Sequence, residues 1–213
     1  MKVIALTGGI ASGKTTACRL FEAHGVPVID TDLLARKAVL KGSPDLSEIE
    51  ERYGPSILDE HGNLKRSKLG EIIFSDADEK SWLEQLLHPR ISTLAKKQYR
   101  LLQQTRSSAY CIYAIPLYVE TLQRAQEQPF RYFRVCLIDL PQEQQAQRLA
   151  ARNKCSLDEA YEILANQVDR HERFGYIQDV LDNRGQEDAL ADQVHYLHMC
   201  YSRLIDRIIS QKR

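Results

Sequence analysis

The sequence has no excess charge of either sign and no long apolar run. Its 29 Lys and Arg residues balance 29 Asp and Glu residues over 213 positions, so the formal net charge is zero. A neutral chain argues against a protein that holds nucleic acid through bulk positive charge. No stretch approaches the roughly 20 apolar residues of a membrane helix, and the first residues lack the apolar core of a secretory signal. We therefore expect neither a nucleic-acid partner nor a membrane segment.

The sequence also lacks closely paired cysteines. The five cysteines include no C-x-x-C pair and are widely spaced, at positions 18, 111, 136, 155 and 200. An odd number of scattered cysteines is typical of free thiols in a reducing compartment. We therefore expect a cytoplasmic protein in which most cysteines are small core residues. The length suits one domain, 1–213, with a sizeable core and room for subdomains.

The first sixteen residues carry a specific motif. Residues 3–6 form a short apolar run that predicts a buried strand. Residues 8–15, Gly-Gly-Ile-Ala-Ser-Gly-Lys-Thr, then fit the phosphate-binding loop G-x-x-x-x-G-K-[ST] at every fixed position. Helix-forming residues follow as far as His24, and Gly25 is a typical helix stop. Strand, glycine loop and helix are the context that this motif requires.

The residue types in this loop suit a nucleoside triphosphate. Gly8 and Gly13 let the backbone curl and bring N–H groups up to phosphate oxygens. The helix that begins near Lys14 points its positive end at the same anion, and the lysine adds a full charge for the β- and γ-phosphates. The Thr15 hydroxyl is placed to ligate Mg²⁺. A plain glycine turn is the alternative, but the pattern arises by chance in roughly one such chain in a hundred.

A second apolar run, 26–29, ends in Asp30-Thr31-Asp32. Ligands of open parallel sheets bind beyond the carboxyl ends of the strands, so we expect these carboxylates to face the phosphate loop. A carboxylate there holds Mg²⁺ through water or accepts the proton of an attacking hydroxyl. Alternatively, one of them caps the next helix, 33–40. Asp30 is the better cap by position, and Asp32 is the better catalytic residue.

The rest of the chain predicts an α/β fold. Strands are expected at 110–115, 135–138 and 180–181, and the helical stretches between them indicate a parallel sheet with layers on both faces. The last helix carries an apolar stripe that we expect to pack on the sheet. This stripe consists of Leu190, Val194, Leu197, Tyr201, Leu204 and Ile208.

Between the second and third strands lies a helical insert, 31–107. It holds no convincing strand and is far longer than a crossover needs, so we expect it to build a second, acceptor-binding surface. Its apolar residues recur at helical spacing and read as core faces. Ser43-Pro44 is typical of a helix start, and Pro89 is expected to end or kink its helix.

Residues 141–176 predict a lid. Arg148 and Arg152 are four residues apart and therefore share one helical face. Ser156 and Glu159 fit a capping box that opens a second helix. In phosphoryl transfer, an arginine on a mobile element neutralises developing charge and excludes water.

Three classes of phosphate-loop protein compete. A GTP-dependent switch needs a guanine-reading N-K-x-D, but residues 153–156, Asn-Lys-Cys-Ser, lack the aspartate. A D-x-x-G match at 182–185 comes too late in the chain. A nucleic-acid motor is usually larger and carries positive charge. A small-molecule kinase fits the length, the insert and the lid arginines.

Further motifs follow the loop in order along the chain. They are 28–32 with Ala35-Arg36, 62–64 with Arg66 and Phe74, 87–91, Pro116-Leu117 with Glu120, 147–149 with Arg152, Gln167, and 180–183 with Gly185. Through this ordered set, nearly the whole chain resembles the dephospho-CoA kinase family.

That resemblance implies a three-layer P-loop kinase fold with a five-stranded parallel sheet, a helical acceptor-binding insert and a lid. It also implies ATP- and Mg²⁺-dependent phosphorylation of the ribose 3′-hydroxyl of dephospho-CoA, the last step of coenzyme A synthesis. The protein is then a monomer or a weak homo-oligomer with a small-molecule substrate. Another nucleotide or small-metabolite kinase, or a non-enzymatic nucleotide switch, remains as an alternative.

The resemblance assigns roles to single residues. Asp32 would orient or deprotonate the 3′-hydroxyl, and Arg148 would contact the transferring phosphoryl group. Arg66 and His88 would shape the acceptor site, and Asn183 would lie near the adenine. The ATP phosphates would lie against Gly8, Ala11, Ser12, Gly13, Lys14, Thr15 and Thr16.

The chain departs from the family pattern in two places. Many relatives carry an aspartate where Ala114 stands, so strand three lacks that metal-site carboxylate and more of the work falls to Thr15 and Asp32. Residues 170–174, Arg-His-Glu-Arg-Phe, also differ from the common pattern at the edge of the lid.

Overall fold

The computed structural model describes residues 1–105, 108–123 and 128–211. The chain forms two compact units. One consists of Met1–Asp30 and Tyr99–Arg213, and the other of Thr31–Gln98. The second unit lies within the range expected as the helical insert, of which residues 106–107 lie outside the described part. The assignment of that unit to acceptor binding stays a prediction.

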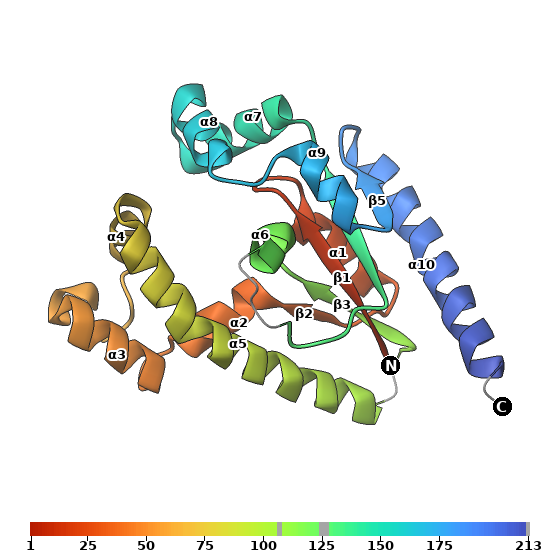
Figure 1. The fold of residues 1–213 in the computed structure, drawn as a ribbon, viewed down its shortest axis with the longest axis horizontal. Coiled ribbons are helices and arrows are strands. Elements are labelled where there is room, and N and C mark those ends of the chain that lie inside the picture. Colours follow the sequence, from red (N-terminus) through yellow and green to blue (C-terminus); the bar gives the residue numbers. More distant parts are fainter. Residues whose placement is uncertain (106–107, 124–127, 212–213) are drawn as a thin grey trace. The chain divides into compact units, whose positions relative to one another are not determined.

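A five-stranded sheet organises the first unit (Figure 1). Its strands are β1 (Lys2–Gly8), β2 (Val28–Asp30), β3 (Tyr110–Ala114), β4 (Arg134–Asp139) and β5 (Asp179–Asp182). The order is β2-β3-β1-β4-β5, and every neighbouring pair is parallel. The expected α/β class with a five-stranded parallel sheet is confirmed. The second strand lies two residues later than predicted, beginning after Pro27.

The register of the sheet brings several strand ends to one edge. Gly8 pairs with Ile138, and Asp30 pairs with Ala114. The loop that follows β1 therefore leaves the sheet at the carboxyl edge, where open parallel sheets bind ligands.

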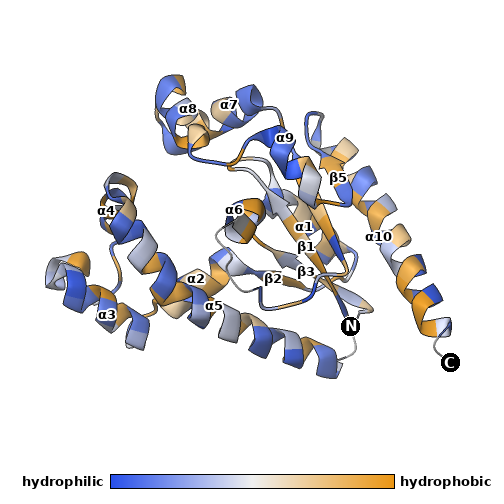
Figure 2. Ribbon diagram, viewed as in Figure 1, coloured by the Kyte–Doolittle hydropathy of each residue, from blue (hydrophilic) through white to orange (hydrophobic). Residues whose placement is uncertain are grey.

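Two helices, α1 (Lys14–Ala23) and α10 (Glu187–Ser210), cover one face of the sheet (Figure 1). Figure 2 shows hydrophobic and hydrophilic residues alternating along α10, as expected of an amphipathic helix. The predicted stripe packs on the sheet at its first four positions but not at Leu204, which is 37% exposed, whereas Ile205 is 1% exposed. Successive helical residues are about 100° apart, so Ile205 continues the buried line and Leu204 falls at its edge.

The opposite face carries α6 (Tyr118–Gln123) and a group of aromatic rings. The Tyr113 ring of β3 lies 5.1 Å from that of Phe130 and 5.9 Å from that of Tyr132. Burial raises the pKa of Tyr113, so its phenol stays protonated at any ordinary pH.

The predicted lid consists of α7 (Gln142–Asn153), α8 (Leu157–Ala165), α9 (Arg170–Arg173) and the short η2 (Phe174–Tyr176). The capping box is confirmed: Ser156 Oγ accepts from the Glu159 N–H at 3.2 Å, and the Glu159 carboxylate accepts from the Ser156 N–H at 2.7 Å. The α7 and α8 helices share a small apolar core, against which Ile10 and Ala11 of the phosphate loop pack.

The second unit is helical. It contains α2 (Thr31–Ala38), α3 (Pro44–Tyr53), η1 (Pro55–Ile57), α4 (Arg66–Ser75) and most of α5 (Ala77–Thr105). The predicted helix start is confirmed, because Ser43 Oγ accepts from the Leu46 N–H at 3.2 Å. Its core combines Val39, Ile49, Ile57, Leu69 and Leu83 with the partly buried Ile72, Ile73, Leu86 and Leu87.

The expectation that Pro89 ends its helix is wrong. The α5 helix runs for 29 residues with Pro89 inside it. Proline has no N–H, so the helix loses only the one hydrogen bond that would reach the Gln85 carbonyl four residues earlier. The many flanking turns of a long helix therefore keep it continuous.

The structure describes the state of the cysteines and the lengths of the helices. The five cysteines, all within the described residues, form no disulfide, and Cys18, Cys111 and Cys136 are buried. In the described ranges, the helices are all too short or too polar to span a membrane.

The shifted stripe of α10 gives a stability test. We expect Ile205→Ala to lower the free energy of unfolding by about 2–4 kcal/mol, because it removes buried methyl groups and leaves a cavity. Leu204→Ala, one position earlier, should change it by less than about 1 kcal/mol. Urea denaturation of the two variants measures this difference. Equal losses would contradict the assignment of Ile205 to the core.

Candidate active site

The phosphate loop has a backbone suited to an anion. After Gly8 the chain turns, with the Ser12 N–H donating to the Gly9 carbonyl at 3.1 Å. Ala11 has φ 60° and Gly13 has φ 100°, both in the left-handed region. Gly13 is the N-cap of α1 and has no side chain to cap the helix, so the positive end of the helix dipole is left for a ligand.

Ser12 adds a polar group inside this cradle. Its side chain is buried, and its Oγ makes no hydrogen bond to any described residue. A Cβ at Gly8 would collide with that Oγ, so glycine is needed there. A cradle with an unsatisfied hydroxyl, a helix N-terminus and Lys14 as the first helical residue fits a polyphosphate. The predicted Thr15 and Thr16 stand in the first turn of α1, with Thr15 exposed.

Asn183 joins the last strand to this loop. Its Nδ2 donates to the Ser12 carbonyl at 2.7 Å, and its backbone N–H donates to the Asp139 carbonyl at 2.9 Å. A Cβ at Gly13 would collide with the same Nδ2, which is a second reason for glycine. Arg148 of α7 donates from Nη2 to the Asn183 carbonyl at 3.1 Å. The structure therefore brings Asn183 and Arg148 together beside Gly13.

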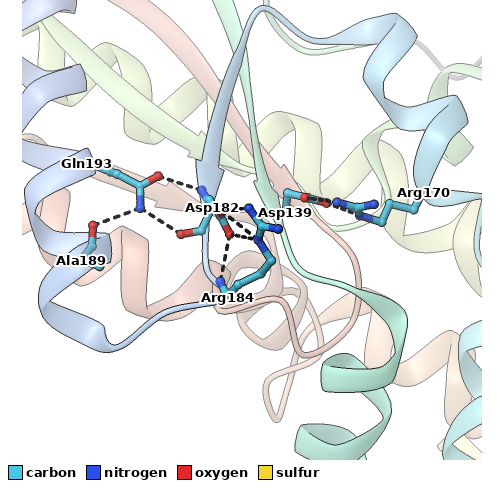
Figure 3. A network of polar contacts seen from close by, with 6 residues as sticks. All are labelled: Asp139, Arg170, Asp182, Arg184, Ala189 and Gln193. Carbon is cyan, nitrogen blue, oxygen red and sulfur yellow. Dashed lines mark hydrogen bonds and ion pairs between the residues drawn. The ribbon is translucent and has the colours of Figure 1, made fainter.

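A polar network holds the ends of β4 and β5 (Figure 3). Asp139 accepts two hydrogen bonds from Arg170, at 2.7 and 2.5 Å. Asp182 accepts from Arg184 Nη2 at 2.6 Å, and this arginine lowers the pKa of the Asp182 carboxyl. Gln193 accepts from the Asp182 N–H and donates to the Asp182 carbonyl, both at 2.9 Å. These bonds hold the backbone on either side of the position occupied by Asn183.

Three polar side chains close over Gly9. A Cβ at Gly9 would lie 2.5 Å from Gln145 Nε2, 2.7 Å from Arg173 Nη1 and 3.1 Å from Gln167 Oε1. Sequence reasoning gave none of these three residues a role, although Gln167 belonged to the family motif. The sequence did contain one sign of this close approach. Residue 9 is a glycine, although the loop motif allows any residue at that position.

The second unit contains a cavity of about 340 Å³. Two predicted site residues line it: Asp32, in the first turn of α2, and Arg66, the first residue of α4. The remaining lining is Ala35, Arg36, Val39, Leu64, Leu69, Gly70, Ile73 and Leu87. His88 lies next to Leu87 on α5 but is not among the described residues that line the cavity. Two arginines, one carboxylate and apolar walls suit a ligand that carries an anionic group.

Within the described ranges, no group of three or more His, Cys, Asp or Glu side chains could hold a metal ion. At the end of β3 stands Ala114, fully buried and in register with Asp30 on β2 and Leu6 on β1. The assignment of the Thr15 hydroxyl as a Mg²⁺ ligand stays a prediction.

The chain matches known proteins over nearly its full length. A sequence model described as dephospho-CoA kinase matches residues 2–189. The dephospho-CoA kinase of Salmonella typhimurium is 38% identical over 212 residues, which cover 99% of this chain and 98% of the relative. The structure of TT1252 from Thermus thermophilus has a TM-score of 0.74 at 26% identity, covering 94% and 97% of the two chains. A dephospho-CoA kinase from Campylobacter jejuni has a TM-score of 0.67 at 24% identity, covering 95% and 98%. The chain belongs to the dephospho-CoA kinase family.

Proposed function

We propose that the protein transfers the γ-phosphoryl group of ATP to the ribose 3′-hydroxyl of dephospho-CoA, which completes coenzyme A. The observation that carries this proposal is a phosphate cradle, built by Gly8, Ser12 and Gly13, in a chain of the dephospho-CoA kinase family. The hydroxyl oxygen attacks the γ-phosphorus, the bond to the β–γ bridging oxygen breaks, and ADP leaves. The protein contributes mainly position and charge.

The phosphate loop binds the ATP phosphates in this proposal. Backbone N–H groups of residues 11–16 surround the anion, and Lys14 neutralises the β- and γ-phosphates. Arg148 contacts the nucleotide from α7 and the transferred phosphoryl group as it passes. Its bond to the Asn183 carbonyl, beside Gly13, supports a place for both residues at the ATP site.

Mg²⁺ is held in this proposal by the Thr15 hydroxyl together with phosphate oxygens and water. Mg²⁺ keeps several waters and is usually bound by few protein groups, so one hydroxyl is a fitting protein ligand. When bound, the ion neutralises phosphate charge.

The acceptor binds to the second unit in this proposal. Asp32 orients the 3′-hydroxyl and accepts its proton, and Arg66 holds an anionic group of dephospho-CoA. The shared cavity of Asp32 and Arg66 supports this pairing. His88 shapes the acceptor site from α5.

We also infer that the protein works in the cytoplasm as a monomer or a weak homo-oligomer. Five thiols without a disulfide support a reducing compartment. A turnover assay with ATP, Mg²⁺ and dephospho-CoA tests the function, with adenosine, AMP and shikimate as competing acceptors. Faster transfer to any of these competitors would contradict the proposed acceptor.

We predict that Lys14→Ala lowers turnover by at least about 10²-fold, because it removes a full positive charge from the phosphates. The fold should survive, since Lys14 lies in the ligand loop and not in the apolar core. Circular dichroism and the turnover assay measure both properties, with the exposed Lys96→Ala as the matched control. Near-normal turnover of the Lys14 variant would refute the loop assignment.

We predict that dephospho-CoA binds more tightly than AMP. The second unit, Thr31–Gln98, provides a cavity beyond what a mononucleotide needs, and Arg66 lines it. Calorimetry with each ligand measures the two dissociation constants, and Arg66→Ala should weaken dephospho-CoA binding more than AMP binding. Equal affinities for the two ligands would mean that the second unit has another purpose.

Asp32→Asn and Arg148→Ala should differ in ATP binding. Asp32→Asn keeps the shape of the side chain but removes its charge, so kcat should fall by about 10²–10⁴-fold while ATP affinity stays nearly constant. Arg148→Ala should lower kcat and also weaken ATP, because the guanidinium contacts phosphates before the reaction.

Calorimetry with a non-hydrolysable ATP analogue separates these two effects. If Asp32→Asn abolished Mg²⁺-ATP binding, Asp32 would be chiefly a metal-site residue. If Arg148→Ala left ATP affinity unchanged, its proposed contact with ground-state phosphates would be wrong.

A further inference from the structure

Gln167 binds the phosphate loop from the lid segment. Its side-chain Oε1 accepts from the Ile10 backbone N–H at 3.0 Å, across 157 positions of sequence. Ile10 follows Gly9, over which Gln145 and Arg173 also close. Ile10 therefore contacts the lid segment in two ways. Its backbone N–H donates to Gln167, and its side chain packs on the α7–α8 core.

Arg173 fixes the orientation of the Gln167 amide. Its Nη2 donates to Gln167 Oε1 at 3.2 Å and to the Val168 carbonyl at 2.8 Å. Arg173 is buried, and burial lowers the pKa of its guanidinium. An amide oxygen that accepts from an arginine presents its remaining lone pair in a set direction. The acceptor for the Ile10 N–H is thus held in place before any ligand binds.

The segment around Gln167 is itself anchored to the body of the first unit. The Val168 N–H donates to Glu120 Oε1 on α6 at 3.0 Å. Two residues after Val168, Arg170 makes its two hydrogen bonds to Asp139 at the end of β4. Asp169 between them caps α9 by accepting from the His171 N–H at 2.7 Å. Residues 167–170 are therefore tied to an element on either side of the loop.

We propose that Gln167 is a positioning residue for phosphoryl transfer, which holds the Ile10 amide so that the phosphate loop keeps its ATP-binding shape. It acts through the loop and touches no substrate. The inference rests on ATP binding at this loop, as proposed above. A displacement of about 1 Å in a reacting group can lower the rate by about 10²-fold. The loss of one hydrogen bond that positions the loop can therefore have a large effect on the rate. The same contact explains why residue 9 is a glycine. A side chain there would push away the polar groups of Gln145, Arg173 and Gln167.

The test compares Gln167→Leu with Gln167→Glu and with Gln178→Leu. Leucine removes the acceptor, whereas glutamate keeps an oxygen for the Ile10 N–H and for Arg173. Gln178 is a matched control, because its Oε1 accepts from the Val135 N–H at 2.8 Å near the amino end of β4. Kinetics and amide hydrogen exchange of Ile10 are measured for each full-length variant.

Gln167→Leu should lower kcat/KM for ATP by about 10–100-fold and speed exchange of the Ile10 amide, with the KM for dephospho-CoA within about twofold. Gln167→Glu should keep the amide protected and recover activity to within about tenfold of wild type, and Gln178→Leu should leave both readouts unchanged. If Gln167→Leu failed to fold, Gly9→Ala, which pushes on the same contact, should give the same loss of activity and protection.

Three results would overturn the proposal. They are unchanged kcat/KM for ATP in Gln167→Leu, an unchanged exchange rate of the Ile10 amide in that variant, and unprotected Ile10 in Gln167→Glu. Amide exchange is read without turnover, and wild-type turnover of dephospho-CoA tests the proposed function separately. A failure of one is therefore distinguishable from a failure of the other.

Discussion

The hydrogen bond from Asn183 to the Ser12 carbonyl joins the end of the last strand to the phosphate loop, and the candidate ATP site depends on it. Without a side chain at Gly13, the Asn183 amide can approach the loop backbone closely. The same Gly13 provides the left-handed turn that starts α1. A single position thus serves the loop geometry, the helix start and the contact with β5. Arg148 joins this contact through the Asn183 carbonyl.

Charge is arranged around the loop in ion pairs and in buried groups. Arg170 pairs with Asp139, and Arg184 pairs with Asp182, at the ends of β4 and β5. These carboxylates therefore hold the backbone at the two strand ends. Arg173 is buried among amide and carbonyl oxygens. Burial disfavours the Arg173 charge, and the nearby Glu120, Asp169 and Asp139 favour it. A buried charge also requires a fixed set of hydrogen bonds. That rigidity suits a segment that holds the phosphate loop.

Local features of this chain were predictable, and long-range ones were less so. The strand, loop and helix of residues 2–23, the Ser43 cap and the Ser156 capping box follow from neighbours within four positions. The expectation that Pro89 ends its helix was wrong, because a long, packed helix outweighs one missing hydrogen bond. Leu204 was wrongly placed in the buried stripe, and Ile205 was left out of it. The surface of the sheet that faces the helix decides which side of a stripe is buried, and sequence periodicity does not contain that surface.

By itself, the sequence determined the parallel α/β class and the phosphate loop, because these depend on residue types at short, fixed spacings. It also determined the kinase family, through an ordered set of motifs along nearly the whole chain. Tertiary structure alone decided that Asn183 supports Ser12 across 171 positions and that Gln167 supports Ile10 across 157. It also placed Asp32 and Arg66 on one cavity. Such contacts depend on how distant segments meet in space, and a hydrogen bond needs a partner within about 3 Å, which no local pattern specifies.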